Sequence, residues 1–367
     1  LNMGFSDYPP YGKLVEHNGS LIGLYSRDGP NNTKDGNTQV FSYNLVTRSI
    51  SSRLDLGRRN FSWRLPGFIK NSNNKLLAIL PRSGITGGGE LLEYTPHLSY
   101  RILQNFNLRE ASFPISNLLE ASNGLLYGTT IRGGKHNMGV LFSYNPSTKA
   151  FRVLNEFSDS INSGREPMGE LIEYSNGIIL GSCRYGGNFD DGVIYTFNIN
   201  RDSISIAFHF DSLSGRNPRC GLMMASNGLV YGTTYSGGTY DEGVLFEFDP
   251  NTNNYTKKRD FFWFDGANPV GLPTEFRSGI LYGTTSNRGQ FTSSGTLYEY
   301  NLNTNSYNVK KQFEHNTGNT GGVPLSTLYL AQDSTLYGST SDYLAISNIE
   351  GSLFNYDPLN DSIQTIS

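Results

Sequence analysis

Apolar and polar residues alternate in short runs along the whole chain. In residues 139–145, for example, Val140, Phe142 and Tyr144 occupy every second position, which places them on one face of an extended strand. No segment keeps the three- and four-residue spacing of apolar positions that a helix of three turns requires. Stretches rich in glycine, asparagine and proline separate the runs, and these residues favour turns. The pattern therefore predicts an all-β chain of short strands.

This pattern repeats about every fifty residues. The segment at residues 123–146, NGLLYGTTIRGGKHNMGVLFSYNP, recurs clearly from Asn176, Asn227, Ser278 and Asp333, and more weakly from Asn18 and Asn73. The residue before the glycine of the Tyr-Gly pair fixes the register at intervals of 50 to 55 residues: Ile22, Leu77, Tyr127, Leu180, Tyr231, Tyr282 and Tyr337. Seven copies fill residues 1–367 as one domain, at approximately 9–56, 64–108, 112–158, 165–211, 216–263, 267–314 and 322–367 plus 1–6.

Each copy is predicted to contain four strands, A to D. In the third copy they lie near residues 115–121, 125–130, 139–145 and 151–157. An Asn-Gly turn, typical of hairpins, joins A to B, and a Pro- and Asn-rich turn joins C to D. Four antiparallel strands repeated seven times favour a seven-bladed β-propeller. A linear β-solenoid is the alternative, although it would usually have shorter repeats and polar caps.

The two ends of the chain indicate how such a ring would close. The chain begins LNMGFSD, which matches the end of strand D in the third copy, VLNEFSD. The last copy stops at SIQTIS, where Ile366 aligns with Leu154. We therefore expect Leu1–Ser6 to complete the last blade, so that the ring has neighbouring termini and no long exposed strand edge.

Residues that recur in register are interpreted first as scaffold. Gly128 and its equivalents lie inside strand B, where glycine usually marks a bulge or the close approach of a neighbouring backbone. Gly139 and its equivalents open strand C, where positive φ or tight packing is expected. The tyrosine of each Tyr-Gly pair should pack between blades with its hydroxyl reaching a partner.

Composition narrows the classes of partner. The net charge is −3, with 17% charged and 13% aromatic residues, so nothing in the bulk charge favours nucleic acid or an anionic membrane. No stretch approaches the roughly 20 apolar residues of a membrane helix, and no signal peptide is visible. Because the first residue is Leu1, we expect a processed or truncated protein. Cys183 and Cys220 are too few for a disulfide framework or a zinc site, and could pair or be two buried thiols.

The residues LYGTT…GG…G.LF.Y.P, clearest in copies three to six, resemble the GloVer-type tandem repeat of secreted bacterial proteins that end in cell-surface sorting signals. The resemblance implies a secreted or surface-attached protein with a propeller-like fold, and it implies no chemistry. The layout is also kelch-like. Several Asp-Ser tripeptides look like an O-glycan acceptor motif of some bacteria, although Asp-Ser also starts turns. They begin at Asp159, Asp202, Asp211, Asp333 and Asp361.

Function is expected where the copies differ. In a four-stranded blade the B–C loops and the D–A loops, which lead from one copy to the next, share one face of the propeller. Arginines beside exposed tyrosines on this face suit an acidic or hydroxyl-rich ligand, while a merely solvated loop face is the alternative. The candidate ligand-binding residues are Arg132, His136, Arg165, Arg184, Tyr185, Arg216, Tyr235 and Arg288.

Other chemistries find less support. The double glycine at 133–134 is followed by a strand, whereas a phosphate loop needs a helix. The acid pairs at 190–191 and 241–242 have too few counterparts for calcium, so we expect no metal and no cofactor. None of the five histidines (His17, His97, His136, His209 and His315) lies in a known catalytic motif.

Three hypotheses remain. The favoured one is a non-enzymatic extracellular module that binds a protein or glycan at the cell surface, for example in adhesion. The alternative is a polysaccharide lyase acting on an acidic glycan, with His136 or Tyr185 as base and Arg184 neutralising a uronate. The third is a structural subunit of a larger assembly.

Overall fold

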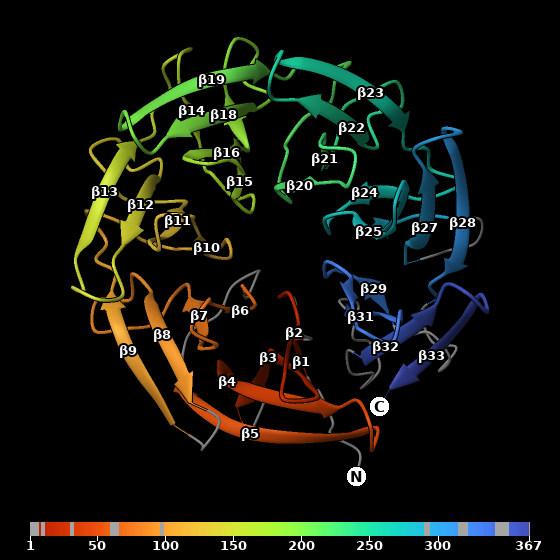
Figure 1. The fold of residues 1–367 in the computed structure, drawn as a ribbon, viewed down its shortest axis with the longest axis horizontal. Helices are drawn as coiled ribbons and strands as arrows, with labels where there is room; N and C mark the ends of the chain where they lie inside the picture. The colour runs from red at the N-terminus through yellow and green to blue at the C-terminus, as the bar shows by residue number, and fades with distance from the viewer. Residues whose placement is uncertain are drawn as a thin grey trace. The chain divides into compact units, whose positions relative to one another are not determined.

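The computed structural model describes residues 7–8, 12–29, 33–58, 66–95, 99–289, 294–314, 322–341 and 352–366. Within these ranges every regular element is a β-strand, and no helix long and apolar enough to cross a membrane occurs in them. The strands form the seven antiparallel sheets of a seven-bladed β-propeller, drawn in Figure 1. This confirms the predicted all-β fold.

The first three sheets cover residues 7–156. The first contains β1 (Asp7–Tyr8), β2 (Val15–His17), β3 (Ser20–Gly29), β4 (Thr33–Asn44) and β5 (Ser49–Arg58). The second contains β6 (Phe68–Lys70), β7 (Leu76–Leu80), β8 (Glu90–Thr95) and β9 (Ser99–Asn105). The third contains β10 (Leu119–Glu120), β11 (Leu126–Thr130), β12 (Val140–Tyr144) and β13 (Phe151–Glu156).

The remaining sheets follow the same plan. The fourth contains β15 (Ile172–Ser175), β16 (Ile178–Cys183), β18 (Val193–Asn198) and β19 (Ser203–His209), beside a two-stranded ladder of β14 (Gly164–Arg165) and β17 (Tyr185–Gly186). The fifth contains β20 (Leu222–Met224), β21 (Val230–Thr234), β22 (Val244–Asp249) and β23 (Asn254–Asp260). The sixth contains β24 (Ala267–Pro269), β25 (Thr274–Arg277), β26 (Ile280–Asn287), β27 (Thr296–Asn301) and β28 (Ser306–Gln312). The seventh contains β29 (Val323–Pro324), β30 (Tyr329–Leu330), β31 (Leu336–Ser341), β32 (Ser352–Asp357) and β33 (Ser362–Ile366).

The chain divides into two compact units. Unit 1 comprises residues 1–70, 95–99 and 263–367, and unit 2 comprises residues 71–94 and 100–262. Within unit 2 the third sheet has strand order β10–β11–β12–β13, so spatial order follows chain order. Its β12–β13 ladder carries a bulge between Leu141 and Phe142, and the fourth and fifth sheets have a bulge at the same place.

The glycine inside strand B makes room for an aromatic ring. A Cβ atom on Gly128 would lie 2.5 Å from Cζ of Phe142 on the facing strand β12, and one on Gly181 would lie 2.4 Å from Cζ of Tyr195. The sequence suggested a neighbouring backbone or a bulge at this position. The bulge occurs in the next ladder, and the atom that excludes a side chain belongs to a ring.

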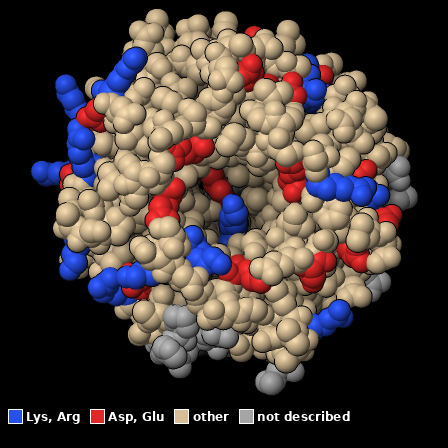
Figure 2. Space-filling model, in the orientation of Figure 1, with Lys and Arg blue, Asp and Glu red and all other residues tan. Residues whose placement is uncertain are grey.

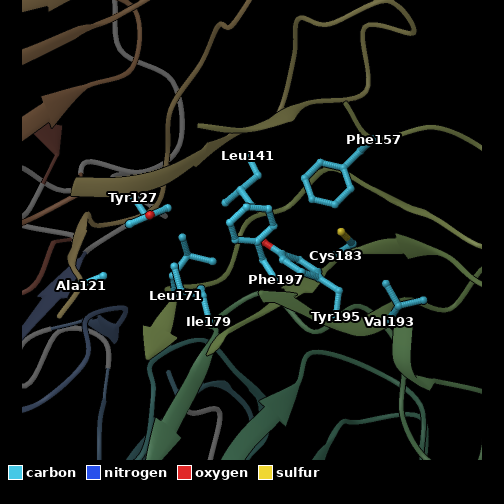
Figure 3. Close-up of a cluster of buried hydrophobic side chains, with 10 residues drawn as sticks. All are labelled: Ala121, Tyr127, Leu141, Phe157, Leu171, Ile179, Cys183, Val193, Tyr195 and Phe197. Atoms are coloured by element: carbon cyan, nitrogen blue, oxygen red, sulfur yellow. The ribbon is translucent and has the colours of Figure 1, made fainter. Parts of the chain in front are cut away.

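A buried cluster in unit 2 joins the third and fourth sheets (Figure 3). Tyr127 of β11 packs against Phe197 of β18 with ring centroids 6.3 Å apart, and its hydroxyl accepts a hydrogen bond from Asn123 Nδ2 at 2.9 Å. This confirms the predicted packing of that tyrosine between blades. Cys183 lies in the same cluster, and both it and Cys220 are free, buried thiols. Burial raises the pKa of Cys183 well above its usual range, so its reactive thiolate is disfavoured.

In unit 1 the first and seventh sheets pack together. The rings of Tyr43 and Tyr337 lie 6.0 Å apart, and the Tyr329 hydroxyl lies 3.4 Å from the Glu16 carboxylate. In the seventh sheet β33 is the last strand of the order β29–β31–β32–β33. Strand β1 pairs with β3 of the first sheet. The predicted completion of the last blade falls on Leu1–Ser6, which lie outside the described residues.

Candidate functional site

Three B–C loops in unit 2 share one backbone frame. In the loop between β11 and β12, the Gly133 N–H donates to Asn137 Oδ1 at 3.0 Å, and Asn137 has a φ of 53°. The two following loops repeat this bond, from Gly186 to Asp190 at 2.9 Å and from Gly237 to Asp241 at 2.8 Å. Asn137, which directly follows the candidate His136, is thus a frame residue. The double glycines belong to the turn, because both members have positive φ in each loop.

A second hydrogen bond fixes the other side of each loop. The Lys135 N–H donates to Glu156 Oε2 at 3.0 Å, and in the next loop the Asn188 N–H donates to His209 Nδ1 at 3.2 Å. In the third loop the Thr239 N–H donates to Asp260 Oδ1 at 2.9 Å. In all three loops the acceptor is the side chain of the last residue of strand D, which is β13, β19 or β23.

One residue remains between these two anchors in each loop, and we call the three of them the tip residues. They are His136, Phe189 and Tyr240. All three are exposed, with 61% of Phe189 and 52% of Tyr240 accessible to solvent. Phe189 and Tyr240 were missed as candidates from the sequence. Their shared position with His136, three residues after the first loop glycine and one before an Asn or Asp with positive φ, is the signal that could have found them.

Arg132 and Arg184 share one carboxylate. Arg132 Nη1 lies 2.9 Å from Glu166 Oε1, and Arg184 Nη1 lies 3.2 Å from Glu166 Oε2. Glu166 belongs to the next D–A loop, and its N–H donates to the Met138 carbonyl at 3.0 Å, so its backbone is fixed beside the preceding B–C loop. Two cations around one anion leave this group with a net positive charge.

Arg165 and Arg184 both lie against Tyr185. Their Cζ atoms lie 5.0 and 4.5 Å from the centroid of its ring, within the range of cation–π attraction. Arg165 also forks onto Asp190, with N–O distances of 2.5 and 2.8 Å, and contacts Asp159 at 3.0 Å. The hydrogen bond from Arg165 holds the pKa of Asp190 below its usual range, and the same bond raises the pKa of Arg165.

Arg216 occupies the equivalent of Arg165 in the following D–A loop. Its Nε lies 3.2 Å from Asp191 Oδ1 and its Nη1 lies 3.8 Å from Asp241 Oδ1. Burial raises the pKa of Asp191, and the charge of Arg216 opposes that rise. Tyr235 is covered by the guanidinium of Arg219, whose Cζ lies 4.0 Å from the ring centroid. Arg219 was not among the residues that the sequence indicated.

Arg288, in unit 1, occupies a frame position. Its φ is 64°, and its carbonyl accepts a hydrogen bond from the Gly295 N–H at 3.2 Å. The carbonyls of Gly133, Gly186 and Gly237 accept the same bond in unit 2. The backbone of Arg288 therefore replaces a glycine of the loop frame.

The structure thus gathers some candidates and separates others. Arg132, Arg165 and Arg184 form one group with Tyr185, while none of the contacts described joins His136 to that group. The guanidinium groups of the four candidate arginines of unit 2 lie beside carboxylates of the same chain. Consistent with this, Lys and Arg side chains and Asp and Glu side chains are both scattered over the face shown in Figure 2, and neither covers it continuously. Among the residues with described positions, no group of three or more His, Cys, Asp or Glu side chains could hold a metal ion.

Solved structures with the same fold include proteins of several activities. The β-propeller domain of the Trilobed protease from Pyrococcus furiosus aligns at a TM-score of 0.56 and 11% identity, over 99% of this chain and 97% of that one. A PL25 ulvan lyase aligns at 0.55 and 10% identity, over 97% and 98%. A fungal AA5 alcohol oxidase in complex with copper aligns at 0.60 and 15% identity, over 96% and 77%. At such identities these likenesses show the fold alone.

Sequence comparison is more specific. No curated protein sequence matches the chain. The family model described as the Gloeobacter/Verrucomicrobia repeat matches residues 9–230 and 176–367, which together span almost the whole chain. The chain therefore belongs to the Gloeobacter/Verrucomicrobia repeat family.

Proposed function

We propose that this protein is a non-enzymatic binding module that presents the B–C and D–A loops to an extracellular partner. The observation that carries the proposal is the loop frame of unit 2. The same two anchoring hydrogen bonds recur in three loops, and each loop holds a different exposed residue between them. A constant frame with variable tips is suited to recognition, because the scaffold folds without depending on the residues that contact a partner.

The module acts outside the cell in this proposal, free or attached to the surface. The family supports this location, since its repeat is typical of secreted proteins. Fractionation of the cells that make the protein, with detection by antibody, tests it. Recovery from the medium or the outer surface is the expected result, and recovery from the cytoplasm alone would contradict it.

Binding is tested with the purified chain and a variant in which His136, Phe189 and Tyr240 are all serine. Both proteins are incubated with envelope material of the producing cells and with isolated extracellular polymers. We expect the wild-type chain to bind and the variant to lose most binding while keeping its melting temperature. Turnover of a polymer by the wild-type chain would contradict the non-enzymatic part of the proposal.

A lyase is the second candidate, and the contact between Arg184 and Tyr185 favours it. A lyase needs a base near a cation that neutralises the uronate, and these side chains lie side by side. The ulvan lyase with the same fold makes the test worthwhile. Incubation with uronate-containing polysaccharides should then release an unsaturated product detected by ultraviolet absorbance, and Tyr185→Phe should abolish it. Absence of product with the wild-type chain refutes this candidate.

A further inference from the structure

Each tip residue of unit 2 is a ring that precedes a planar polar side chain. The pairs are His136–Asn137, Phe189–Asp190 and Tyr240–Asp241. The Asp190 and Asp241 side chains are 59% and 68% exposed, so their carboxylates lie at the surface next to exposed rings. We propose that these tips bind a neutral polysaccharide, with the rings covering the C–H faces of sugar units and the carboxylates and amide accepting hydrogen bonds from hydroxyls. The proposal rests on the binding function above and names its ligand class.

The backbones that carry the rings are ordered before a ligand arrives. On one side of each tip residue an N–H is bonded to the end of strand D, and on the other side the Asn or Asp closes the turn. Tyr240 is supported further by Phe262, with ring centroids 4.6 Å apart. Binding therefore costs little free energy for ordering the loops. The modest contact energy that a single sugar ring provides can then be enough for binding.

The charges that follow the second and third rings favour a neutral polymer over an acidic one. Arg165, the cation that pairs with the residue directly after the second tip, is forked onto Asp190, and its side chain is only 26% exposed. The exposed charges directly after the rings are the carboxylates of Asp190 and Asp241. An acidic glycan would meet these carboxylates and would have to displace arginines from their partners, both of which cost free energy.

The repetition favours a polymer over a single sugar. The tips occur once per sheet in three consecutive sheets of unit 2, at the same place in each B–C loop. A chain long enough to reach two tips gains affinity through effective concentration, whereas a monosaccharide occupies one ring at a time. Affinity should therefore rise with the length of the oligosaccharide.

A protein partner would use different residues of the same loops. Ile161 and Leu213, in the D–A loops, are 62% and 66% exposed. Branched aliphatic side chains suit the apolar core of a protein interface and offer no flat face to a sugar ring. They provide a matched control, because their loss should leave polysaccharide binding intact and should weaken a protein interface.

The experiment uses the full chain and affinity electrophoresis in gels that contain a soluble β-glucan, xylan, galactomannan or polygalacturonate. We expect retardation by at least one neutral polymer and none by polygalacturonate. Each ring should contribute roughly two- to tenfold in affinity, so Phe189→Ala with Tyr240→Ala should lower it by about four- to hundredfold. Phe189→Tyr with Tyr240→Phe should retain it, as should Ile161→Ser with Leu213→Ser. Circular dichroism melts confirm that the variants are folded.

The outcomes separate this inference from the broader function. Retardation by no neutral polymer, or equal retardation of the wild type and the Phe189→Ala, Tyr240→Ala variant, overturns the inference. Loss of retardation in the Ile161→Ser, Leu213→Ser variant alone, or retardation by polygalacturonate alone, also overturns it but leaves a binding module standing. Shortening of the neutral polymer during the assay would instead contradict the non-enzymatic function.

Discussion

Replacement of Gly128 by alanine tests whether the strand-B glycine exists to accommodate a ring. The new Cβ would lie 2.5 Å from Cζ of Phe142, whereas carbon atoms prefer about 3.5–4.0 Å, so the ring must move by about 1 Å. Phe142 is fully buried, and its ring has Phe106 and Phe151 at centroid distances of 5.2 and 5.3 Å. The ring has no free space for that movement.

The size of the effect follows from two opposing contributions. Overpacking of a core usually destabilises by about 1–3 kcal/mol. Alanine also restricts the unfolded chain at a position where φ is not left-handed, which stabilises by about 0.4–1 kcal/mol. We therefore expect Gly128→Ala to lower the free energy of unfolding by about 1–2 kcal/mol, as measured by equilibrium urea denaturation followed by circular dichroism.

A double-variant cycle decides the mechanism. Phe142→Leu removes the atoms that clash, so Gly128→Ala should cost about 1 kcal/mol less in that background than in the wild type. Gly124→Ala is the control, since its φ is 75° and nothing lies within 4 Å of a Cβ there, so its cost should not depend on residue 142. If the effects of Gly128→Ala and Phe142→Leu add within about 0.5 kcal/mol, the ring is not the reason for the glycine.

Three further predictions follow from buried or paired groups. Tyr195→Phe should leave the free energy of unfolding in urea unchanged or raise it by up to about 1–2 kcal/mol. The buried hydroxyl has no hydrogen-bond partner among the residues described, and phenylalanine fills this place in both neighbouring sheets. A clear loss of stability would contradict this prediction. Arg165→Gln should raise the pKa of Asp190 in an NMR titration. Because the folded pKa of Asp190 is depressed, the pair stabilises above the ordinary carboxyl pKa and this contribution disappears as the pH falls through the depressed value, so the variant and the wild type should converge in stability at acid pH. Cys183 should react with a thiol reagent only after unfolding, and rapid labelling in the native state would show that the cluster opens.

The fold was predictable because seven imperfect copies carry the same signals. A weak strand signal in one copy is supported by the same positions in the others. In the third copy, for example, all four predicted strands coincide with β10 to β13 of the structure. The role of Gly128 was harder to predict. Its partner, Phe142, lies fourteen residues away on the facing strand, and only the register of the β11–β12 ladder places the ring over the glycine.

The site was only partly predictable for a different reason. Sequence comparison of the copies treats Asn137 and Asp190 as different residues, although an amide and a carboxylate oxygen accept the same bond from the turn. It also treats Arg132 as an unpaired cation, because its partner Glu166 belongs to the next copy. Contacts between copies determine which charges are available, and the repeat pattern within one copy contains no information on them.

The loop frame explains how the tips can differ without loss of the fold. Both anchoring bonds of each loop begin at backbone N–H groups, and their acceptors are side chains outside the tip position, such as Glu156 and Asn137 for the first loop. Substitution at the tip therefore changes neither donor nor acceptor, and an exposed side chain contributes little to the core. Selection can then act on the ring at each tip independently. The same reasoning predicts that residues in the anchors tolerate far less change than His136, Phe189 or Tyr240, because loss of an anchor releases the turn that holds the ring.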